Sequence, residues 1–353
     1  MWNAISRILR AIPFILLGIV ILKATATRAG TLMVWGNDSF GQKTSAPVGD
    51  FRGLAVGGAT QGLAIRLDRT FVLWGGEVPG EESPPIVDPA AIPFDVPDHL
   101  KNETVVGACL GRGQAALILQ DKTLASWSRF RPDPIPPAGR FRELACGNRH
   151  TIALALDGTL DGWGANDVNP STLLLPEGNY KAIAARVLYS MALQTDGTLV
   201  GWGQTPVFTT WSQIPEDPDH FYAQGRYKAI AAGISHALAL RQDGSVAAWG
   251  VNPGSESHGN PLRAPEHVRF KSISAGNGFS VGIDTEGTLW GWGTPSPLVG
   301  VPLPPVSWTF AEEGWEPFGD AGHYFVPESK FKTVIAAAFH VAAITEDEAG
   351  DSE

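Results

Sequence analysis

The sequence has few cysteines, no basic cluster and no long apolar run, and each shortage narrows what the protein can be. Two cysteines among 353 residues leave room for a single disulfide bond. The net charge is −10, and no Lys or Arg cluster occurs after residue 30, which argues against nucleic acid and anionic membranes as main partners. The apolar run at residues 11–22 holds twelve residues, short of the ~20 that a membrane-spanning helix needs. Signals for helices are weak throughout.

Tryptophan, by contrast, marks a repeated segment that fills most of the chain. The seven copies end at Trp35, Trp74, Trp127, Trp163, Trp202, Trp249 and Trp292. The clearest copy is 227–250, YKAIAAGISHALALRQDGSVAAWG, and residues 141–164 and 180–203 repeat it closely. The spacing between successive tryptophans runs from 36 to 53 residues, a period typical of propellers and solenoids. We therefore expect one domain built from equivalent units.

Each copy has a part of constant length and a part of variable length. An acidic residue stands six positions before the tryptophan in every full copy, and a Gln, His, Tyr or Phe stands seven positions before that acid. All variation in length falls after the Trp-Gly pair, which in one copy is Trp127-Ser128. The constant part indicates framework, and the variable part indicates loops.

The constant part predicts a small antiparallel sheet. Asp-Gly pairs at 157–158, 196–197 and 243–244 separate apolar runs, which predicts two-residue hairpins of type I′. A second turn at Gly233 and its equivalents gives each copy three strands, and the segment after Trp-Gly has room for a fourth. Four-stranded sheets repeated round an axis form a β-propeller, with each tryptophan wedged between neighbouring sheets.

The two chain ends share the seventh copy. Residues 331–347 match the first half of a copy, and residues 30–36 match the second half, so that the seam falls inside the hairpin turn. Pairing of the two ends would close the ring and leave no open sheet edge. The sequence therefore predicts an all-β fold, a seven-bladed β-propeller over residues 30–353, closed by the N- and C-terminal half-repeats.

Residues 1–29 have a composition of their own. Arg7 and Arg10 precede the apolar run, and small residues follow it. This order is typical of a secretory signal peptide, with cleavage expected near Ala26 or Ala29. An uncleaved N-terminal anchor is the alternative. A signal peptide would make the propeller secreted or periplasmic.

The two cysteines, Cys109 and Cys146, lie in neighbouring copies. With a one-residue insertion allowed in those copies, both take the position that Val56, Ala185 or Ala232 takes elsewhere. One interpretation is a pair of small buried apolar side chains. The other is an inter-blade disulfide, although inner strands of adjacent blades usually lie farther apart than the ~7 Å between Cα atoms that a bridge allows.

Three histidines, His150, His236 and His340, share one position of the repeat. Such positions could converge on the axis and bind a metal, but zinc needs three or four ligands within bonding distance. Other residue types fill the position in the remaining copies. We therefore expect each histidine to form a hydrogen bond within its own blade, and we expect neither a metal nor a cofactor.

The repeat, written aromatic-K-x-I-A-A-G-x-x-H-A-L-A-L-x-x-D-G-x-x-x-x-W-G, resembles that of the regulator of chromosome condensation family over nearly the whole chain after residue 30. It differs from a WD repeat because Gly rather than Asp follows Trp. The short repeats and signal-like start are similar to the secreted β-lactamase inhibitor protein II branch, which implies a seven-bladed propeller that binds a target protein through one loop face. The nuclear branch implies nucleotide exchange on a small GTPase, but the acidic balance departs from it. No functional residue carries over from either branch, because those residues lie in variable loops.

Two variable segments combine aromatic and acidic residues. The candidate binding residues are Phe208, Trp211 and Tyr222 in segment 204–226, and Trp308, Trp315 and Tyr324 in segment 294–330. Exposed aromatics interleaved with charges are typical of protein-binding hot spots. The alternative is that these loops fold back and bury the rings against the edge of a blade.

The sequence thus predicts a monomeric, non-enzymatic scaffold that binds a protein partner through its loop face. One alternative is a lectin-like propeller whose loop tryptophans stack on the sugar rings of a glycan. Another is a hydrolase that uses loop carboxylates such as Glu312, Glu313 and Asp320, because glycoside hydrolysis needs two acids at set distances. A nucleotide-exchange regulator is the alternative if residues 1–29 are not a signal.

Overall fold

The computed structural model describes most of the repeated region and little of the variable segments. The described residues are 18–19, 30–36, 41–57, 61–75, 95–111, 113–128, 135–164, 173–203, 212–214, 217–250, 261–293, 316–318, 323–326, 329–338 and 340–346. They form strands and a short 3₁₀ turn, η2 (Asp98–Leu100). Within these ranges no helix has the length and apolar character of a membrane span. The prediction of an all-β chain is confirmed.

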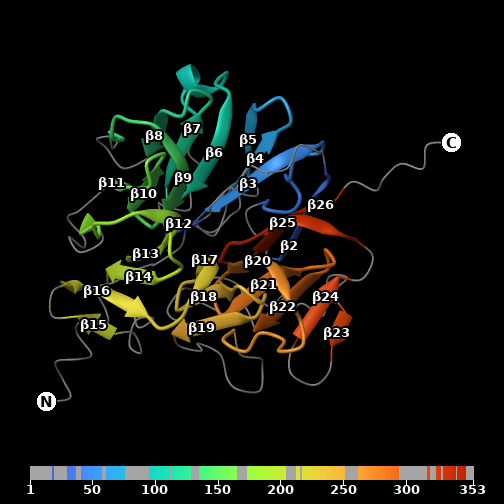
Figure 1. Ribbon diagram of the computed structural model, residues 1–353. Coiled ribbons are helices and arrows are strands. Elements are labelled where there is room, and N and C mark those ends of the chain that lie inside the picture. Colours follow the sequence, from blue (N-terminus) through green and yellow to red (C-terminus); the bar gives the residue numbers. More distant parts are fainter. Residues whose placement is uncertain are drawn as a thin grey trace, which may run out of the picture.

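The strands form seven antiparallel sheets in the described residues (Figure 1). The first sheet contains β1 (Gly18–Ile19), β3 (Phe51–Gly57), β4 (Gln61–Arg66) and β5 (Phe71–Gly75). The second contains β6 (Val105–Leu110), β7 (Gln114–Leu119) and β8 (Leu124–Ser128). The third contains β9 (Phe141–Cys146), β10 (His150–Ala155) and β11 (Leu160–Gly164).

The remaining sheets follow the same plan. The fourth has β12 (Tyr180–Arg186), β13 (Tyr189–Gln194), β14 (Leu199–Gly203), β16 (Asp217–Ala223) and β15 (Ser212–Ile214). The fifth has β17 (Tyr227–Ala232), β18 (His236–Arg241) and β19 (Val246–Gly250). The sixth has β20 (Phe270–Ala275), β21 (Phe279–Asp284), β22 (Leu289–Gly293), β24 (His323–Val326) and β23 (Glu316–Phe318). The seventh has β25 (Phe331–Ala336), β26 (His340–Thr345) and β2 (Leu32–Gly36).

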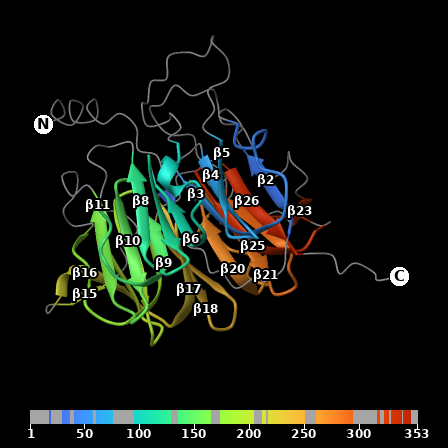
Figure 2. The same cartoon turned by 90° about the horizontal axis from the view of Figure 1, so that it is seen from above.

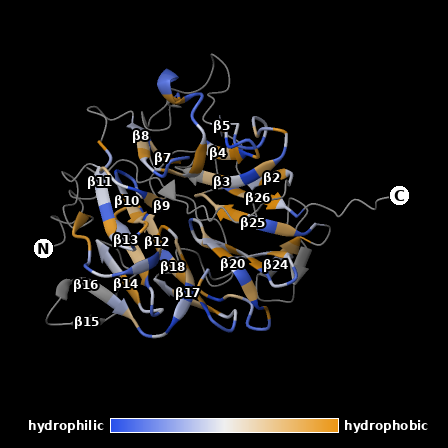
Figure 3. Cartoon of the chain, turned by 45° about the horizontal axis from the view of Figure 1, so that its top comes forward, coloured by the Kyte–Doolittle hydropathy of each residue, from blue (hydrophilic) through white to orange (hydrophobic). Residues whose placement is uncertain are grey.

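The middle strand of each sheet is apolar on both faces because a neighbouring sheet covers each face. In β10, for example, the five residues 150–154 are buried and residue 155 is partly buried. Its alternate side chains enter different clusters: Ile152 and Leu154 pack toward the fourth sheet, and Ala153 packs toward the second. Figure 3 shows the corresponding orange stretches along the strands.

The tryptophans lie between sheets, as the sequence predicts. Trp127 of β8 lies 6.5 Å, between ring centroids, from Phe71 of β5 in the preceding sheet. Trp163 of β11 packs in one cluster with Ala116 and Ile118 of β7. Trp202 of β14 is fully buried in a cluster with residues of β10. Each of these rings therefore fills the space between its own sheet and the one before it.

The hairpin turns differ from the predicted two-residue type I′ form. Type I′ needs positive φ at both central residues, but of Asp157 and Gly158 only the glycine has it, at 95°. The Gly158 amide donates to Ala155 O at 3.1 Å, and the Ala155 amide donates to Thr159 O at 3.0 Å. The connection is a three-residue turn, 156–158, whose last residue is left-handed. The Asp157 carboxylate accepts hydrogen bonds from the Thr159 amide at 3.0 Å and its hydroxyl at 2.7 Å.

One backbone hydrogen bond recurs at every junction between successive sheets. The amide of the first residue of a sheet donates to the carbonyl of the last turn residue in the preceding repeat, as Tyr180 does to Gly158 O at 2.8 Å. The same bond joins Phe141 to Lys122 O, Tyr227 to Gly197 O, Phe270 to Gly244 O, Phe331 to Gly287 O and Val105 to Arg69 O. At the seam between the chain ends, Phe51 N donates to Gly30 O at 3.2 Å. The split repeat therefore uses the same junction as the intact ones.

Strands from near the two ends of the repeated region meet in the seventh sheet, where β2 pairs with β26 (Figure 1). Gly36 lies opposite His340, and Leu32 lies opposite Ile344. The strands β25 and β26 also contact β3 of the first sheet. Figure 2 shows the blue β2 beside the red β26 from a second direction. Closure into a seven-bladed ring stays a prediction, and these contacts are the reason to expect it.

Candidate functional site

Four of the six predicted binding aromatics lie outside the described residues. They are Phe208, Trp211, Trp308 and Trp315. The other two lie on strands at the outer side of their sheets: Tyr222 on β16, opposite Val200 of β14, and Tyr324 on β24, opposite Gly291 of β22. The segments after Trp202 and Trp292 thus supply the predicted fourth strand, and each adds a fifth strand as well.

The two described tyrosines pack against the framework. The Tyr222 ring is partly buried against the cluster that contains Trp202 and Tyr180. The Tyr324 ring is partly buried against the cluster that contains Phe331. Both rings therefore contribute to the packing of their outer strands and keep part of their surface exposed. Their role in binding stays a prediction.

The position shared by Gln, His, Tyr and Phe carries hydrogen bonds from one sheet to the next. Gln114 Nε2 donates to His150 O of the third sheet at 2.9 Å. The Tyr189 hydroxyl donates to Gly233 O of the fifth sheet at 2.7 Å and lies 3.1 Å from His236 O. These side chains therefore form hydrogen bonds to the turn between the first and second strands of the next repeat. We call this turn the inner turn.

Two of the three histidines at this position, His150 and His236, also bond across sheets, so for them the prediction of bonds within one blade is wrong. His150 Nε2 lies 2.9 Å from Ser190 Oγ of the fourth sheet, and His236 Nε2 lies 2.9 Å from Ser280 Oγ of the sixth. The reason is that the position stands at the end of the strand nearest the neighbouring turn. Burial lowers the pKa of His150 to about 4 and, with the charge of Arg186 as a smaller cause, that of His236 to about 3. Both rings are neutral hydrogen-bonding groups at neutral pH.

The described residues contain no group of three His, Cys, Asp or Glu side chains close enough to hold a metal ion. His150 and His236 have Ser hydroxyls as Nε2 partners rather than other ligands. The repeated Asp carboxylates sit in exposed hairpin turns, where hydrogen bonds from the following Thr or Ser lower their pKa, as at Asp121 and Asp243. These groups build framework.

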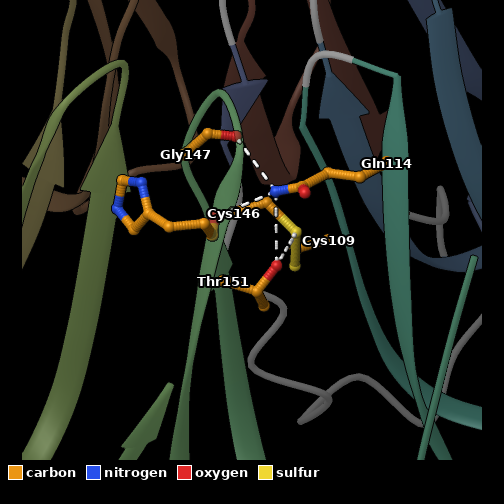
Figure 4. The surroundings of a disulfide bond; sticks show 6 residues. Cys109, Gln114, Cys146, Gly147 and Thr151 are labelled. Atoms are coloured by element: carbon orange, nitrogen blue, oxygen red, sulfur yellow. Dashed lines mark hydrogen bonds between the residues drawn. A yellow bond between two sulfur atoms is a disulfide. The ribbon is translucent and has the colours of Figure 1, made fainter. Parts of the chain in front are cut away.

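The two cysteines form a disulfide bond between β6 and β9 (Figure 4). Their Cα atoms lie 5.6 Å apart, within the range that a bridge needs. Gln114 reaches the same place, since its Nε2 lies within 3.5 Å of Gly147 O and 3.4 Å of Thr151 Oγ1 (Figure 4). The expectation that inner strands lie too far apart for a bridge is therefore wrong here.

The sequence comparison also misplaced the cysteines by one residue. Cys146 lies opposite Thr151, the residue after His150. In the second repeat the equivalent residue is Leu110, which lies opposite Ala115, the residue after Gln114. Cys109 is the residue before Leu110 and needs no insertion. Alternate residues of a strand point to opposite faces, so Cys109 points to the third sheet and Cys146 points back to the second. Equivalent positions would have pointed the same way and could not have formed the bridge.

A buried arginine, Arg186, is a feature that the sequence analysis did not single out. It ends β12 at the inner turn of the fourth repeat, where the third, fifth and sixth repeats have Gly147, Gly233 and Gly276. Its side chain is fully buried. The replacement of glycine by arginine in an otherwise regular repeat was a visible signal in the sequence.

The comparisons with known proteins identify the repeat. A model described as the regulator of chromosome condensation (RCC1) repeat matches residues 141–169, 227–258 and 270–296. The protein carries RCC1 repeats. A search of curated protein sequences finds no match. The narrower resemblance to the β-lactamase inhibitor protein II branch stays a prediction.

Solved structures agree with the RCC1-type propeller. Prp20p from Saccharomyces cerevisiae is similar at a TM-score of 0.64 and 18% identity, over 92% of this chain and 93% of that chain. Human WBSCR16 is similar at a TM-score of 0.61 and 15% identity, over 91% of this chain and 100% of that one. The ectodomain of the receptor kinase ACR4 from Arabidopsis thaliana has a TM-score of 0.52 at 14% identity, over 81% and 89% of the two chains. At these identities the likeness concerns the fold.

Proposed function

We propose that this RCC1-repeat protein is an exported, non-enzymatic scaffold that binds a protein partner through the segments after Trp-Gly. The observation that carries the proposal is the contrast between the constant and the variable part of the repeat. Strands, turns and inter-sheet hydrogen bonds are uniform, whereas the segments after Trp-Gly differ in length and composition. A rigid framework with variable loops is the usual arrangement for recognition. Prp20p, which shares the fold, has binding properties to Gsp1p and histones.

The disulfide bond supports the export part of the proposal. Disulfides persist in oxidising compartments and are rare in the cytosol, so Cys109–Cys146 fits a secreted or periplasmic protein. The signal-like residues 1–29 point the same way. Two observations of different kind therefore favour export.

The intact mass and N-terminal sequence of the protein from native fractions test export. Expected is a chain that begins between Thr27 and Gly30, with both cysteines protected from alkylation until a reductant is added. A cytosolic chain that begins at Met1 and has two free thiols would overturn the export proposal.

Binding is tested with a partner enriched from the same extracytoplasmic fraction and purified. Isothermal titration with the wild-type protein should give a saturable signal that Trp308→Ala and Trp315→Ala weaken at least tenfold. A matched control is Leu156→Ala, because Leu156 is 49% exposed and lies in a hairpin turn, outside the segments after Trp-Gly. Equal affinity of all four proteins would exclude the aromatic segments from the interface. Binding to a glycan array in place of a protein would favour the lectin-like alternative.

A nucleotide-exchange regulator is the second candidate, favoured by the structural similarity to Prp20p and by the binding of that protein to Gsp1p. It requires an intracellular location. Release of a fluorescent guanine nucleotide from a small GTPase measures the activity directly. An acceleration by the full chain, together with a cytosolic location, would replace the scaffold proposal.

A further inference from the structure

Arg186 is a charged side chain buried at the end of β12. It is fully buried, and its Nε, Nη1 and Nη2 atoms all lack a partner among the described residues. A guanidinium carries five N–H donors in a planar fork, and leaving them unpaired away from water is costly. Packing of the framework therefore does not explain why an arginine stands at this position.

In the described part of the chain, the groups beside Arg186 offer no compensating negative charge. The neighbours that influence it electrostatically are the Tyr189 hydroxyl on β13 and the His236 imidazole on β18. Burial raises the pKa of Tyr189, so that group is neutral, and His236 is neutral as well. Burial lowers the pKa of Arg186 to about 9, which leaves it protonated at neutral pH. Its positive charge is thus unbalanced by any group that the structure describes.

The turn that follows Arg186 is strained. Val187 has a φ of 39°, which a β-branched residue rarely adopts. In the third and sixth repeats the position of Arg186 has no space for a side chain: a Cβ on Gly147 would lie 2.1 Å from the His150 ring, and one on Gly276 would lie 2.3 Å from the Phe279 ring. Strain and buried charge together indicate a site with a function beyond packing.

Further polar groups without partners lie on the neighbouring inner turns. Asn148 on the turn of the third repeat donates its backbone amide to Val187 O at 3.1 Å, and its side-chain Oδ1 has no partner in the described region. Ser235 Oγ and His236 Nδ1, on the turn of the fifth repeat, are also buried without partners there. The fourth repeat therefore lies between two turns that carry unused polar groups.

We propose that Arg186 holds one small oxyanion, a phosphate or a carboxylate, at the inner turns of the third, fourth and fifth repeats. The planar guanidinium fork matches two oxygens of such an anion in a bidentate pair. The Ser235 hydroxyl and the Asn148 amide, which can be turned to present its NH₂, supply further donors. The anion balances the buried charge and ties three repeats together at one point.

The predicted signal segment borders this place. β1 contacts β12, which ends in Arg186, and also contacts β3, β6 and β9. Removal of residues 1–29 by a signal peptidase would take β1 away from β12. The test is therefore made on the protein as recovered from its native fractions.

The first measurement is thermal unfolding in inorganic phosphate or acetate at constant ionic strength, with chloride as the balancing ion. The wild-type melting temperature should rise by about 5 °C at roughly one hundred times the dissociation constant. Arg186→Ala, which copies Ala337 at the same position, should not respond. Arg186→Lys keeps the charge but loses the fork and should respond weakly. Arg241→Ala is the matched control because Arg241 is exposed on the neighbouring sheet, and it should respond as the wild type does.

The second measurement covers an anion that is already bound. Protein exchanged into a phosphate-free and carboxylate-free buffer is denatured, and the released anions are identified by ion chromatography. About one equivalent from the wild type and none from Arg186→Ala supports the site and tells phosphate from carboxylate. The absence of both a released anion and a thermal response in the wild type would overturn the proposal. An equal response of Arg186→Ala and Arg186→Lys to that of the wild type would overturn it as well.

Discussion

At the scale of single residues, the disulfide shows how much depends on strand alternation. A shift of one position turns a side chain from one face of its sheet to the other. Cys109 and Cys146 can join because they stand one position apart in the repeat and therefore face each other. The bridge links the second and third sheets at their inner strands.

Loss of this bridge should lower stability. Cys109→Ser or Cys146→Ser is expected to reduce the free energy of unfolding by about 3–4 kcal/mol, from the entropy of a closed loop whose ends are 37 residues apart. Urea denaturation measures the change. The control is the wild type in reductant, which should unfold at nearly the same urea concentration as the variants. Unchanged midpoints in all samples would contradict a stabilising bridge.

The buried histidines predict a dependence of stability on pH. The unfolded chain binds protons near the ordinary pKa of 6.5, whereas folded His150 does so near 4. The unfolded state therefore binds more protons between these values, so stability is complete above about pH 6.5 and falls as pH decreases through 4. The loss amounts to roughly 3 kcal/mol for such a histidine.

His150→Gln tests this assignment, because Gln61 and Gln114 occupy the same position in other repeats. Urea midpoints measured from pH 7.5 to 4 should fall less steeply in the variant than in the wild type. Parallel curves would mean that another group controls the response.

The sequence predicted where the repeated residues lie better than it predicted which groups they contact. The tryptophan wedges followed from the period alone, because a large aromatic at a fixed place in each repeat has to pack between sheets. The partners of His150 and His236 were predicted wrongly because a repeat examined singly does not show which groups of the next repeat come near. The repeat position of Cys109 was predicted wrongly because the alignment of the repeats included an insertion of one residue that the structure does not have.

At the scale of elements, the turns between the second and third strands share one backbone conformation but differ in the residue at their last position. The last turn residue is left-handed in the intact repeats, with φ of 95° at Gly158 and 76° at Lys122. Glycine adopts this conformation freely, whereas other L-residues pay roughly 1–2 kcal/mol. The repeats are therefore not equally well suited to their common turn.

Substitutions at these two positions should change the free energy of unfolding in opposite directions. Lys122→Gly is expected to raise the free energy of unfolding by up to about 1 kcal/mol, since the relief of strain exceeds the added freedom of the unfolded chain. Gly158→Ala should lower it by about 1 kcal/mol, because the new Cβ lies 3.1 Å from Asn179 Oδ1 and φ stays positive. Chemical denaturation of both variants measures the pair. Shifts of the same sign would contradict a common turn geometry.

The turn type itself could not be settled from Asp-Gly alone. Both a two-residue and a three-residue connection place glycine at a left-handed position, and they differ in the φ of the aspartate. The side chain of Asp157 binds the amide and hydroxyl of Thr159, which favours the longer turn. The strands after Trp202 and Trp292 were predicted only as room for a fourth strand, because their sequences lack clear alternation.

At the scale of the whole molecule, the seam joins segments from opposite ends of the chain. The β2 strand has its sheet partner in β26, and Gly30 supplies the junction to Phe51. The seventh sheet, and its junction with the first sheet, therefore need residues from both ends of the repeated region.

Truncation tests this dependence. A chain that stops after residue 330 lacks β25 and β26, leaves β2 without its partner, and should lose its cooperative unfolding transition. A chain that stops after residue 346 keeps both strands and should unfold at the wild-type temperature. Calorimetry of the two chains distinguishes them. A cooperative transition near the wild-type temperature in the shorter chain would contradict closure through the seam.

The position of the seam also sets the order in which the protein can fold. Gly36 finds its partner His340 only after nearly the whole chain has been synthesised, so β2 has no partner strand while the first six sheets form. Contacts between residues so distant in sequence are slow to form. A ribosome that has made most of this protein still holds a chain whose ends are unjoined. If the proposed export is correct, the chain would cross the membrane before this seam has closed.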